Sequence, residues 1–324
     1  MFAKLIDTLK KSPKTIVFTE GTDPRILEAS ARLLSGNFLK PVLVGNPDEI
    51  AAAAEDIGFN IRGAEIIDPE NYDGMDEMVD EMVKLRKGKM TADECRAALK
   101  KSNYFGTMLV KMGKADCLLG GATYSTADTV RPALQLIKTK PGNKIVSSCF
   151  IMVRPAASGE NEVLAMADCA INIKPNEDEL VEICKETVSC AKIFGVDPKV
   201  AFLSYSTLGS GKGEDVDKMR NACEKAKALM PDTPIGGEFQ FDAAVSPTVA
   251  KTKHITDAVG GHANTFIFPD INAGNIGYKI AQRLGGFEAY GPILQGLNAP
   301  INDLSRGCNA DEVYKMAIIT AGMA

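Results

Sequence analysis

Histidine is scarce in this sequence, which has two histidines in 324 residues. A catalytic triad that uses histidine as its base therefore has few candidates, and neither His254 nor His262 stands in a nucleophile motif. The eight cysteines form no Cys-x-x-Cys pair, and no histidine lies at zinc-ligand spacing from them. We therefore expect no structural or catalytic metal, and we expect most cysteines to be small buried hydrophobes.

Long apolar runs and an excess of positive charge are also missing. No run approaches the ~20 apolar residues that span a membrane, and charged residues interrupt the first apolar positions, so no secretory signal pattern is visible. The net charge of -5 argues against a general nucleic-acid binder, although local arginines can still bind an anionic substrate. We expect a cytoplasmic protein with no nucleic-acid or membrane partner.

The length and composition of the chain predict two globular domains. A chain of 324 residues is long for one domain, and a hydrophobic content of 45% is ordinary for a globular protein. Pro141-Gly142-Asn143 is a candidate junction, and the glycine-rich segment 285–298 is a second one.

Short β-type apolar runs alternate with helical stretches along the chain. We expect strands at residues 15–18, 41–44, 115–119, 144–152, 169–173, 200–204 and 265–268. We expect helices at residues 24–34, 49–55, 76–87, 91–101, 177–194, 214–229 and 273–283. This alternation predicts an α/β protein with mainly parallel sheets that helices cover on both faces.

The segment Ser305-Arg306-Gly307 places a hydroxyl, a guanidinium and a glycine directly before a helical pattern. That pattern consists of Val313, Met316, Ala317 and Thr320. Asn309 suits the N-cap of this helix, and Glu312 completes the spacing of a capping box. A helix N-terminus suits an anion, and Arg306 can hold a phosphate with two parallel bonds. The alternative is an ordinary capped helix with a solvated arginine.

Two further arginines are candidates for binding an anion. Arg131 belongs to a polar stretch that follows the expected strand at 115–119, and loops at the carboxyl ends of parallel strands commonly bind ligands. Pro132 disfavours the α region for Arg131 and indicates a helix edge or a kink. Arg86 lies in a basic cluster whose simplest interpretation is a solvated helix C-terminus.

The glycine-rich segment 209–213 looks like a phosphate-binding loop. Its lysine is followed by glycine, so it does not match the order of known phosphate loops. A plain turn between a strand and a helix is the simpler interpretation, although the segment could shape a coenzyme A site.

Long ungapped blocks resemble a known family. The main blocks are residues 120–132, 268–281, 285–296 and 300–308. They strongly resemble the phosphate acetyltransferases (phosphotransacetylases) of the phosphate acetyl/butyryltransferase family, and the resemblance runs from Phe18-Thr19-Glu20-Gly21 to the last helix. It implies two α/β domains like those of isocitrate and isopropylmalate dehydrogenases, with the active site in the cleft between them. The first domain would combine residues 1–141 and 297–324, and the second would be 142–296. A homodimer is also implied.

The resemblance implies reversible transfer of an acetyl group between coenzyme A and phosphate, by direct thiolate attack in a ternary complex. Acetyl-CoA and phosphate are then the substrates and no cofactor is expected, while stimulation by a monovalent cation stays open. Arg86, Arg131 and Arg306 would hold the phosphate. No Gly-x-Ser-x-Gly segment surrounds Ser305, so we expect its hydroxyl to stabilise the oxyanion together with Arg306 and not to act as nucleophile.

The general base that would deprotonate the coenzyme A thiol has two candidates. The family's aspartate falls four residues after Cys308, on Glu312, and Asp311 lies beside it. A positioned carboxylate can take the proton of a thiol whose free pKa is about 8.5. Glu312 is also placed to cap its own helix, so a purely structural role is nearly as well supported.

Three other functions are alternatives to acetyl transfer. A phosphate butyryltransferase would differ only in the size of its acyl pocket. A decarboxylating dehydrogenase of the same fold would need an aspartate cluster for a divalent metal, and the sequence has no such cluster. A non-catalytic phosphate-sensing protein would not need the full set of arginines and serine.

Overall fold

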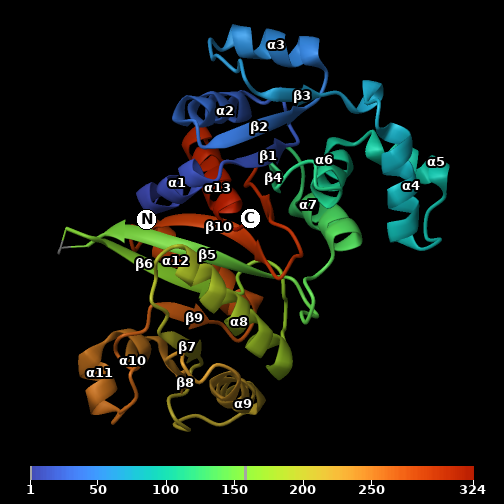
Figure 1. The fold of residues 1–324 in the computed structure, drawn as a ribbon. Coiled ribbons are helices and arrows are strands. Elements are labelled where there is room, and N and C mark those ends of the chain that lie inside the picture. Colours follow the sequence, from blue (N-terminus) through green and yellow to red (C-terminus); the bar gives the residue numbers. More distant parts are fainter. Residues whose placement is uncertain (1, 157–158) are drawn as a thin grey trace. The chain divides into compact units, whose positions relative to one another are not determined.

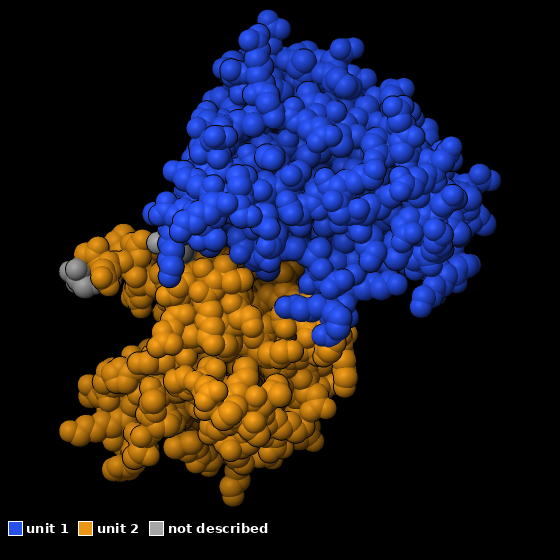
Figure 2. All heavy atoms as spheres, viewed as in Figure 1, with its two compact units in different colours: residues 1–141, 297–324 blue, residues 142–296 orange. Residues whose placement is uncertain are grey.

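The computed structural model describes residues 2–156 and 159–324 of the chain. Clustering of contacts divides the chain into two compact units, which Figure 2 colours separately. Unit 1 consists of Met1–Pro141 and Leu297–Ala324, and unit 2 of Gly142–Gly296. Each unit has a β-sheet of its own, so both are α/β units.

The sheet of unit 1 is built from both ends of the chain. Its strands are β1 (Lys14–Phe18), β2 (Leu39–Val44), β3 (Glu65–Ile67), β4 (Cys117–Gly120) and β11 (Ile301–Asp303). They lie in the order β11-β4-β1-β2-β3, and every pair is parallel. The carboxyl ends of β11, β4 and β1 are therefore neighbours, at the edge where parallel sheets commonly bind ligands.

Helices cover both faces of this sheet, as Figure 1 shows. The helices of unit 1 are α1 (Phe2–Lys11), α2 (Pro24–Gly36), α3 (Pro47–Asp56), η1 (Pro69–Asn71), α4 (Met75–Arg86), α5 (Ala92–Leu99), α6 (Ser102–Lys111), α7 (Thr126–Pro132), the π-helical η2 (Ala133–Ile137) and α13 (Ala310–Gly322). On one side α2 and α13 pack together, with α13 also against β1 and β4. On the other side α6 packs against β1 and β4, so buried strand residues such as Val17 and Leu118 form a core between two helical layers.

The sheet of unit 2 is mixed. Its strands are β5 (Ser147–Pro155), β6 (Asn161–Ala167), β7 (Val200–Leu203), β8 (Ile235–Phe239), β9 (Thr265–Ile267) and β10 (Glu288–Gln295), and their order is β10-β5-β6-β9-β7-β8. β5 pairs antiparallel with β10 and β6, whereas the remaining neighbours are parallel. The helices are α8 (Glu177–Ile193), α9 (Glu214–Leu229), α10 (Phe241–Val245), α11 (Pro247–Thr252) and α12 (Ile271–Arg283).

The predicted α/β class with mainly parallel sheets is confirmed, and local signals explain many helix starts. Asp23 caps α2 ahead of Pro24, because its side chain accepts from the backbone N–H of Arg25. Reciprocal capping boxes begin α5, α8 and α13. The expected box of Asn309 and Glu312 is among them.

One sequence expectation about unit 2 is wrong. The strand expected at 169–173 does not form, and β6 lies earlier in the chain. The reason is Asp168, whose buried carboxylate accepts the backbone N–H groups of Ala170, Ile171 and Asn172, so the chain turns around it. The segment 285–298, expected as a junction, contains the boundary between Gly296 of unit 2 and Leu297 of unit 1. It also contains β10, which is hydrogen-bonded to β5 along most of its length.

Candidate active site

The loop between β11 and α13 carries the Ser305-Arg306-Gly307 motif to the carboxyl edge of the unit 1 sheet. Its first residue, Leu304, donates its N–H to the carbonyl oxygen of Gly120 at 2.7 Å, which ties the loop to the end of β4. A tight turn follows, because Cys308 N–H donates to Ser305 O at 2.9 Å. The strand order thus explains why this motif faces the end of a parallel sheet.

The close approach of the β4 and β11 ends requires a glycine. Gly121 has a φ of +97°, a region that side chains rarely adopt, and a Cβ atom there would collide with Oδ1 of Asp303. The Asp303 carboxylate in turn accepts from the hydroxyls of Thr126 at 2.6 Å and Thr129 at 2.5 Å, both on α7. These bonds hold the start of α7 against β11.

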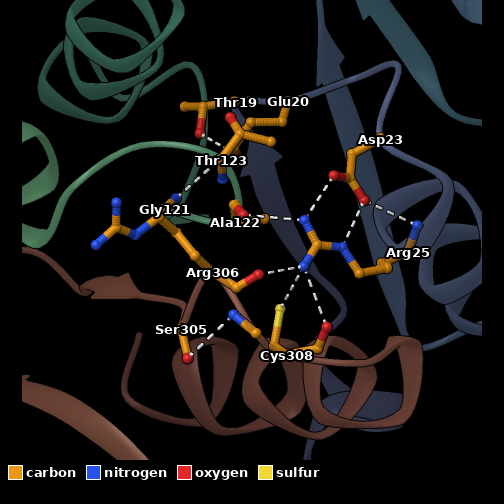
Figure 3. A network of polar contacts seen from close by, with 11 residues as sticks. Thr19, Glu20, Asp23, Arg25, Gly121, Ala122, Thr123, Ser305, Arg306 and Cys308 are labelled. Carbon is orange, nitrogen blue, oxygen red and sulfur yellow. Dashed lines mark hydrogen bonds and ion pairs between the residues drawn. The ribbon is translucent and has the colours of Figure 1, made fainter.

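Ser305 and Arg306 are both exposed. The Ser305 Oγ atom accepts from Gly307 N–H at 3.3 Å, which leaves its own hydroxyl hydrogen available. Within the described residues the guanidinium of Arg306 has no hydrogen bond or ion pair, and in Figure 3 it points away from the guanidinium of Arg25. The two groups that the sequence singled out are thus free to meet a ligand.

The two candidate bases are both engaged at the start of α13. One oxygen of Glu312, Oε2, accepts from Asn309 N–H at 2.9 Å, and Glu312 N–H donates to Asn309 Oδ1 at 2.9 Å. Asp311 forms ion pairs at 2.9 Å with Arg32 and Lys315, and the hydrogen bond from Arg32 is the main cause that lowers the pKa of Asp311. Lowering its pKa makes Asp311 a weaker base, which favours Glu312 for proton transfer.

Arg131 and Arg86 both lie in the last turns of helices of unit 1. Arg131 is in the last turn of α7, so the expectation that Pro132 keeps Arg131 out of the α region is wrong. The expected helix edge is present, because α7 ends at Pro132 and the π-helical η2 begins at the next residue. Its side chain is exposed and borders a hollow of about 350 Å³. Arg86 ends α4, which packs on η2. Its Nε atom is buried without a hydrogen-bond partner among the described residues.

Two carboxylates behind the loop, the half-buried Glu20 and the buried Asp303, escaped the sequence interpretation. Glu20 follows β1 and accepts from the N–H groups of Gly121 at 2.9 Å and Thr123 at 3.2 Å. Burial raises the pKa of Glu20 and also that of Asp303. Both carboxyl groups are therefore easier to protonate than exposed ones. The family block at Phe18-Thr19-Glu20-Gly21 was the available sequence signal for Glu20.

Arg25 is the second group that sequence reasoning missed. It lies in the first turn of α2, and its guanidinium forms an ion pair at 2.7 Å with Asp23. It also donates to the carbonyl oxygens of Ala122, Arg306 and Cys308 (Figure 3). These acceptors are backbone atoms far away in the sequence, so no motif could have indicated them.

The glycine-rich segment 209–213 is a turn between β7 and α9 that is hydrogen-bonded to Glu238. The buried carboxylate of Glu238 accepts from Gly209 N–H at 2.7 Å and from the hydroxyl of Ser206 at 2.9 Å. The helix that follows, α9, carries Glu214, Asp215 and Asp217 in its first turn. The hydrogen bonds to Glu238 hold the segment as a turn between β7 and α9, which supports the simpler interpretation.

Two other kinds of feature are absent from residues 2–156 and 159–324. None of the helices there is long and apolar enough to cross a membrane. Within the same ranges, His, Cys, Asp and Glu form no group of three that could hold a metal ion. The eight cysteines are buried and unpaired, as expected.

The fold and the loop together define an α/β protein whose helix start at the end of a parallel sheet suits an anion. The chain belongs to the phosphate acetyl/butaryl transferase family, whose model matches residues 1–321. A phosphate acetyltransferase of Bacillus subtilis is 51% identical over 324 residues, which cover 100% of this chain and 99% of that protein.

Solved structures agree with this assignment. A phosphotransacetylase from Streptococcus pyogenes is 51% identical, covers 99% of this chain and 98% of its own, and superposes with a TM-score of 0.94. A Salmonella typhimurium structure described as a 4-hydroxythreonine-4-phosphate dehydrogenase is 12% identical, covers 97% of this chain and 100% of its own, and has a TM-score of 0.55. The last likeness concerns the fold alone, and it matches the expected dehydrogenase-like architecture.

Proposed function

We propose that this chain is a phosphate acetyltransferase, which transfers an acetyl group reversibly between coenzyme A and phosphate. Relatives that are about half identical over the full chain carry that activity in their names. A single structural observation carries the proposal. Just before the start of α13, Ser305 presents an exposed hydroxyl and Arg306 presents a guanidinium that has no hydrogen bond or ion pair within the described residues.

The proposed reaction is direct attack of the coenzyme A thiolate on acetyl phosphate. The sulfur forms a bond to the carbonyl carbon, the bond from that carbon to the phosphate oxygen breaks, and phosphate leaves with the electron pair. Ser305 and Arg306 stabilise the tetrahedral oxyanion as hydrogen-bond donors. The thiol proton moves to Glu312, whose Oε1 atom is not the oxygen that caps Asn309.

Phosphate binding is assigned to Arg86, Arg131 and Arg306. Arg131 and Arg306 are exposed, and Nε of Arg86 is buried without a partner among the residues described. A guanidinium without a protein partner can offer two parallel N–H groups to a phosphate. Binding of the substrates in the cleft between the two predicted domains stays a prediction.

The test is a thiol assay on the purified full chain with acetyl-CoA and phosphate, without added nicotinamide and with EDTA present. We expect free thiol to appear only when phosphate is added, and acetyl phosphate to accumulate in equal amount. Butyryl-CoA in the same assay separates the alternative, because a higher kcat/KM for butyryl-CoA would make the chain a butyryltransferase. Dependence on a restored divalent metal would contradict the metal-free mechanism.

We also propose a homodimer, supported by an apolar stripe on α12. Ile276, Ile280 and Leu284 are spaced four residues apart and are 57%, 53% and 85% exposed. Such stripes on a surface commonly mark an interface, and Ile280 also lines a pocket of about 630 Å³. A cytoplasmic location and stimulation by a monovalent cation stay predictions.

The homodimer is tested by sedimentation velocity on Ile280→Glu. We expect the variant to sediment as a monomer and the unaltered protein as a dimer. Leu229→Glu is the matched control, because Leu229 is an equally exposed apolar residue at the end of α9. If the unaltered protein sediments as a monomer, the proposal of a homodimer is wrong.

A further inference from the structure

The guanidinium of Arg25 uses all of its hydrogen-bond donors within the protein. An arginine side chain has five N–H bonds in a fixed planar fork. Nε donates to Asp23 Oδ1 at 2.9 Å, and Nη2 donates to Asp23 Oδ2 at 2.7 Å and to the carbonyl oxygen of Ala122 at 2.9 Å. Nη1 donates to the carbonyl oxygens of Arg306 at 2.8 Å and Cys308 at 3.1 Å.

These acceptors join three loops that follow neighbouring parallel strands. Asp23 belongs to the loop after β1, Ala122 to the loop after β4, and Arg306 to the loop after β11. The carboxylate of Asp23, which is 10% exposed, fixes the orientation of the fork by a bidentate contact. The remaining N–H bonds therefore point in fixed directions, toward carbonyl groups on the other two loops.

This arrangement separates the roles of two arginines that lie close together. Arg25 cannot bind a phosphate without breaking bonds that it already makes, whereas the guanidinium of Arg306 makes no hydrogen bond or ion pair within the described residues. Arg25 holds the backbone of Arg306 and Cys308, on both sides of Gly307, and thus fixes the turn from which Ser305 and Arg306 project (Figure 3).

We propose that Arg25 is a positioning residue for acetyl transfer, which sets the geometry of the Ser305–Arg306 turn from behind and does not touch substrate. The proposal rests on the roles proposed above for Ser305 and Arg306. Lysine cannot take over this function, because a single ammonium group lacks the planar fork that reaches three loops at once.

The first test is Arg25→Lys in the thiol assay, with Arg25→Ala beside it. Because a displacement of about 1 Å in catalytic groups can cost roughly 100-fold in rate, we expect kcat to fall by about two orders of magnitude. We expect the KM values for acetyl phosphate and coenzyme A to change only a few-fold. Arg96→Lys is the matched control, since Arg96 pairs with Asp76 at the surface of the same unit and should stay fully active.

A second readout distinguishes positioning from a general loss of structure. If Arg25 acts through the turn, the loss in the double variant with Arg306→Ala should be smaller than the sum of the two single losses, because part of what Arg25 positions is the side chain of Arg306. Amide hydrogen exchange of the peptide 303–309 should accelerate in Arg25→Lys, whether or not the enzyme turns over. If the arginine variants do not fold, Asp23→Asn loosens the same fork and should lower kcat in the same direction.

The outcomes that overturn the proposal are distinct. A kcat for Arg25→Lys within about threefold of the unaltered protein would do so, as would independent, additive losses with Arg306→Ala. A rise in the KM for acetyl phosphate at unchanged kcat would make Arg25 a substrate ligand. Absence of acetyl transfer in the unaltered protein would instead overturn the proposed function, while the hydrogen-exchange result would still test the contact.

Discussion

Asn309 and Glu312 cap helix α13 reciprocally: each side chain accepts the backbone N–H of the other residue at 2.9 Å. The carboxylate that the family pattern places at the position of the base is thus also a structural element. Only Oε2 of Glu312 takes part in the cap, so the two roles are compatible in one side chain.

We predict that Glu312→Gln lowers kcat by a factor on the order of 10²–10⁴, because an amide cannot accept the thiol proton. The melting temperature should change little, since glutamine also completes a capping box. Steady-state kinetics in the thiol assay and thermal unfolding measure the two effects separately. A near-normal kcat in this variant would show that Glu312 caps α13 and does not act as the general base.

Asp311→Asn is the matched variant for that experiment. Its carboxylate is half exposed and already pairs with Arg32 and Lys315, so we expect a mild effect on kcat. An inactive Asp311→Asn combined with an active Glu312→Gln would move the base to Asp311.

The capping box illustrates what could be predicted from the sequence. The strands of unit 1 at 15–18 and 41–44, the helices at 24–34 and 214–229, and the start of α13 follow from periodicity and cap residues, which are local signals. The failed strand at 169–173 is different, because a buried carboxylate at Asp168 competes for its backbone N–H groups. An apolar run does not reveal such a competitor.

The residues of the candidate site also fall into two groups, those that a local sequence signal indicates and those that no local signal indicates. Ser305, Arg306 and Glu312 share one motif, whereas Arg25 and its acceptor Arg306 lie 281 residues apart. A carbonyl oxygen is present in every residue, so the sequence carries no mark of which ones an arginine will bind. The set of backbone acceptors could be found only once the strand order had placed β11 beside β4 and β1.

Arg131→Ala is predicted to raise the KM for phosphate and acetyl phosphate roughly ten- to hundredfold. The reason is that hydrogen bonds to a charged group are worth about 1.5–3 kcal/mol, and the exposed guanidinium of Arg131 has no competing partner among the described residues. The KM for coenzyme A should move much less in the same initial-rate measurements. An equal rise for both substrates would show that Arg131 organises the site and does not hold phosphate in particular.

The buried carboxylate of Asp303 leads to a prediction about how the stability of the folded protein depends on pH. An unfolded aspartate titrates near pH 3.9, and burial raises the pKa of Asp303 in the folded protein. Between these two values the folded state binds more protons, so the contribution of Asp303 to stability falls as pH rises through the folded pKa. The melting temperature of Asp303→Asn should therefore improve, relative to the unaltered protein, as the pH is raised from about 4 to 7.

Asp311→Asn provides a control of opposite sign for the pH experiment. The pKa of Asp311 is lowered, so its contribution to stability is present above the unfolded pKa and is lost as pH falls. Relative to the unaltered protein this variant should lose melting temperature as pH rises, by a small amount because the pairs are half exposed. Parallel pH profiles for Asp303→Asn and Asp311→Asn would refute the opposed shifts.

Direct attack predicts that the enzyme never carries the acetyl group itself. Within the described part of the chain, no base accepts a hydrogen bond from the Ser305 hydroxyl. Burial raises the pKa of the Cys308 thiol to about 11, so little of the nucleophilic thiolate exists at neutral pH. Intact-protein mass spectrometry after mixing with acetyl-CoA alone should therefore show no added acetyl group. Labelled coenzyme A should not exchange into acetyl-CoA until phosphate is supplied, and initial-rate plots for the two substrates should intersect. Stoichiometric acetylation of Ser305 or Cys308, with parallel initial-rate lines, would replace the ternary complex by a ping-pong route through an acyl-enzyme.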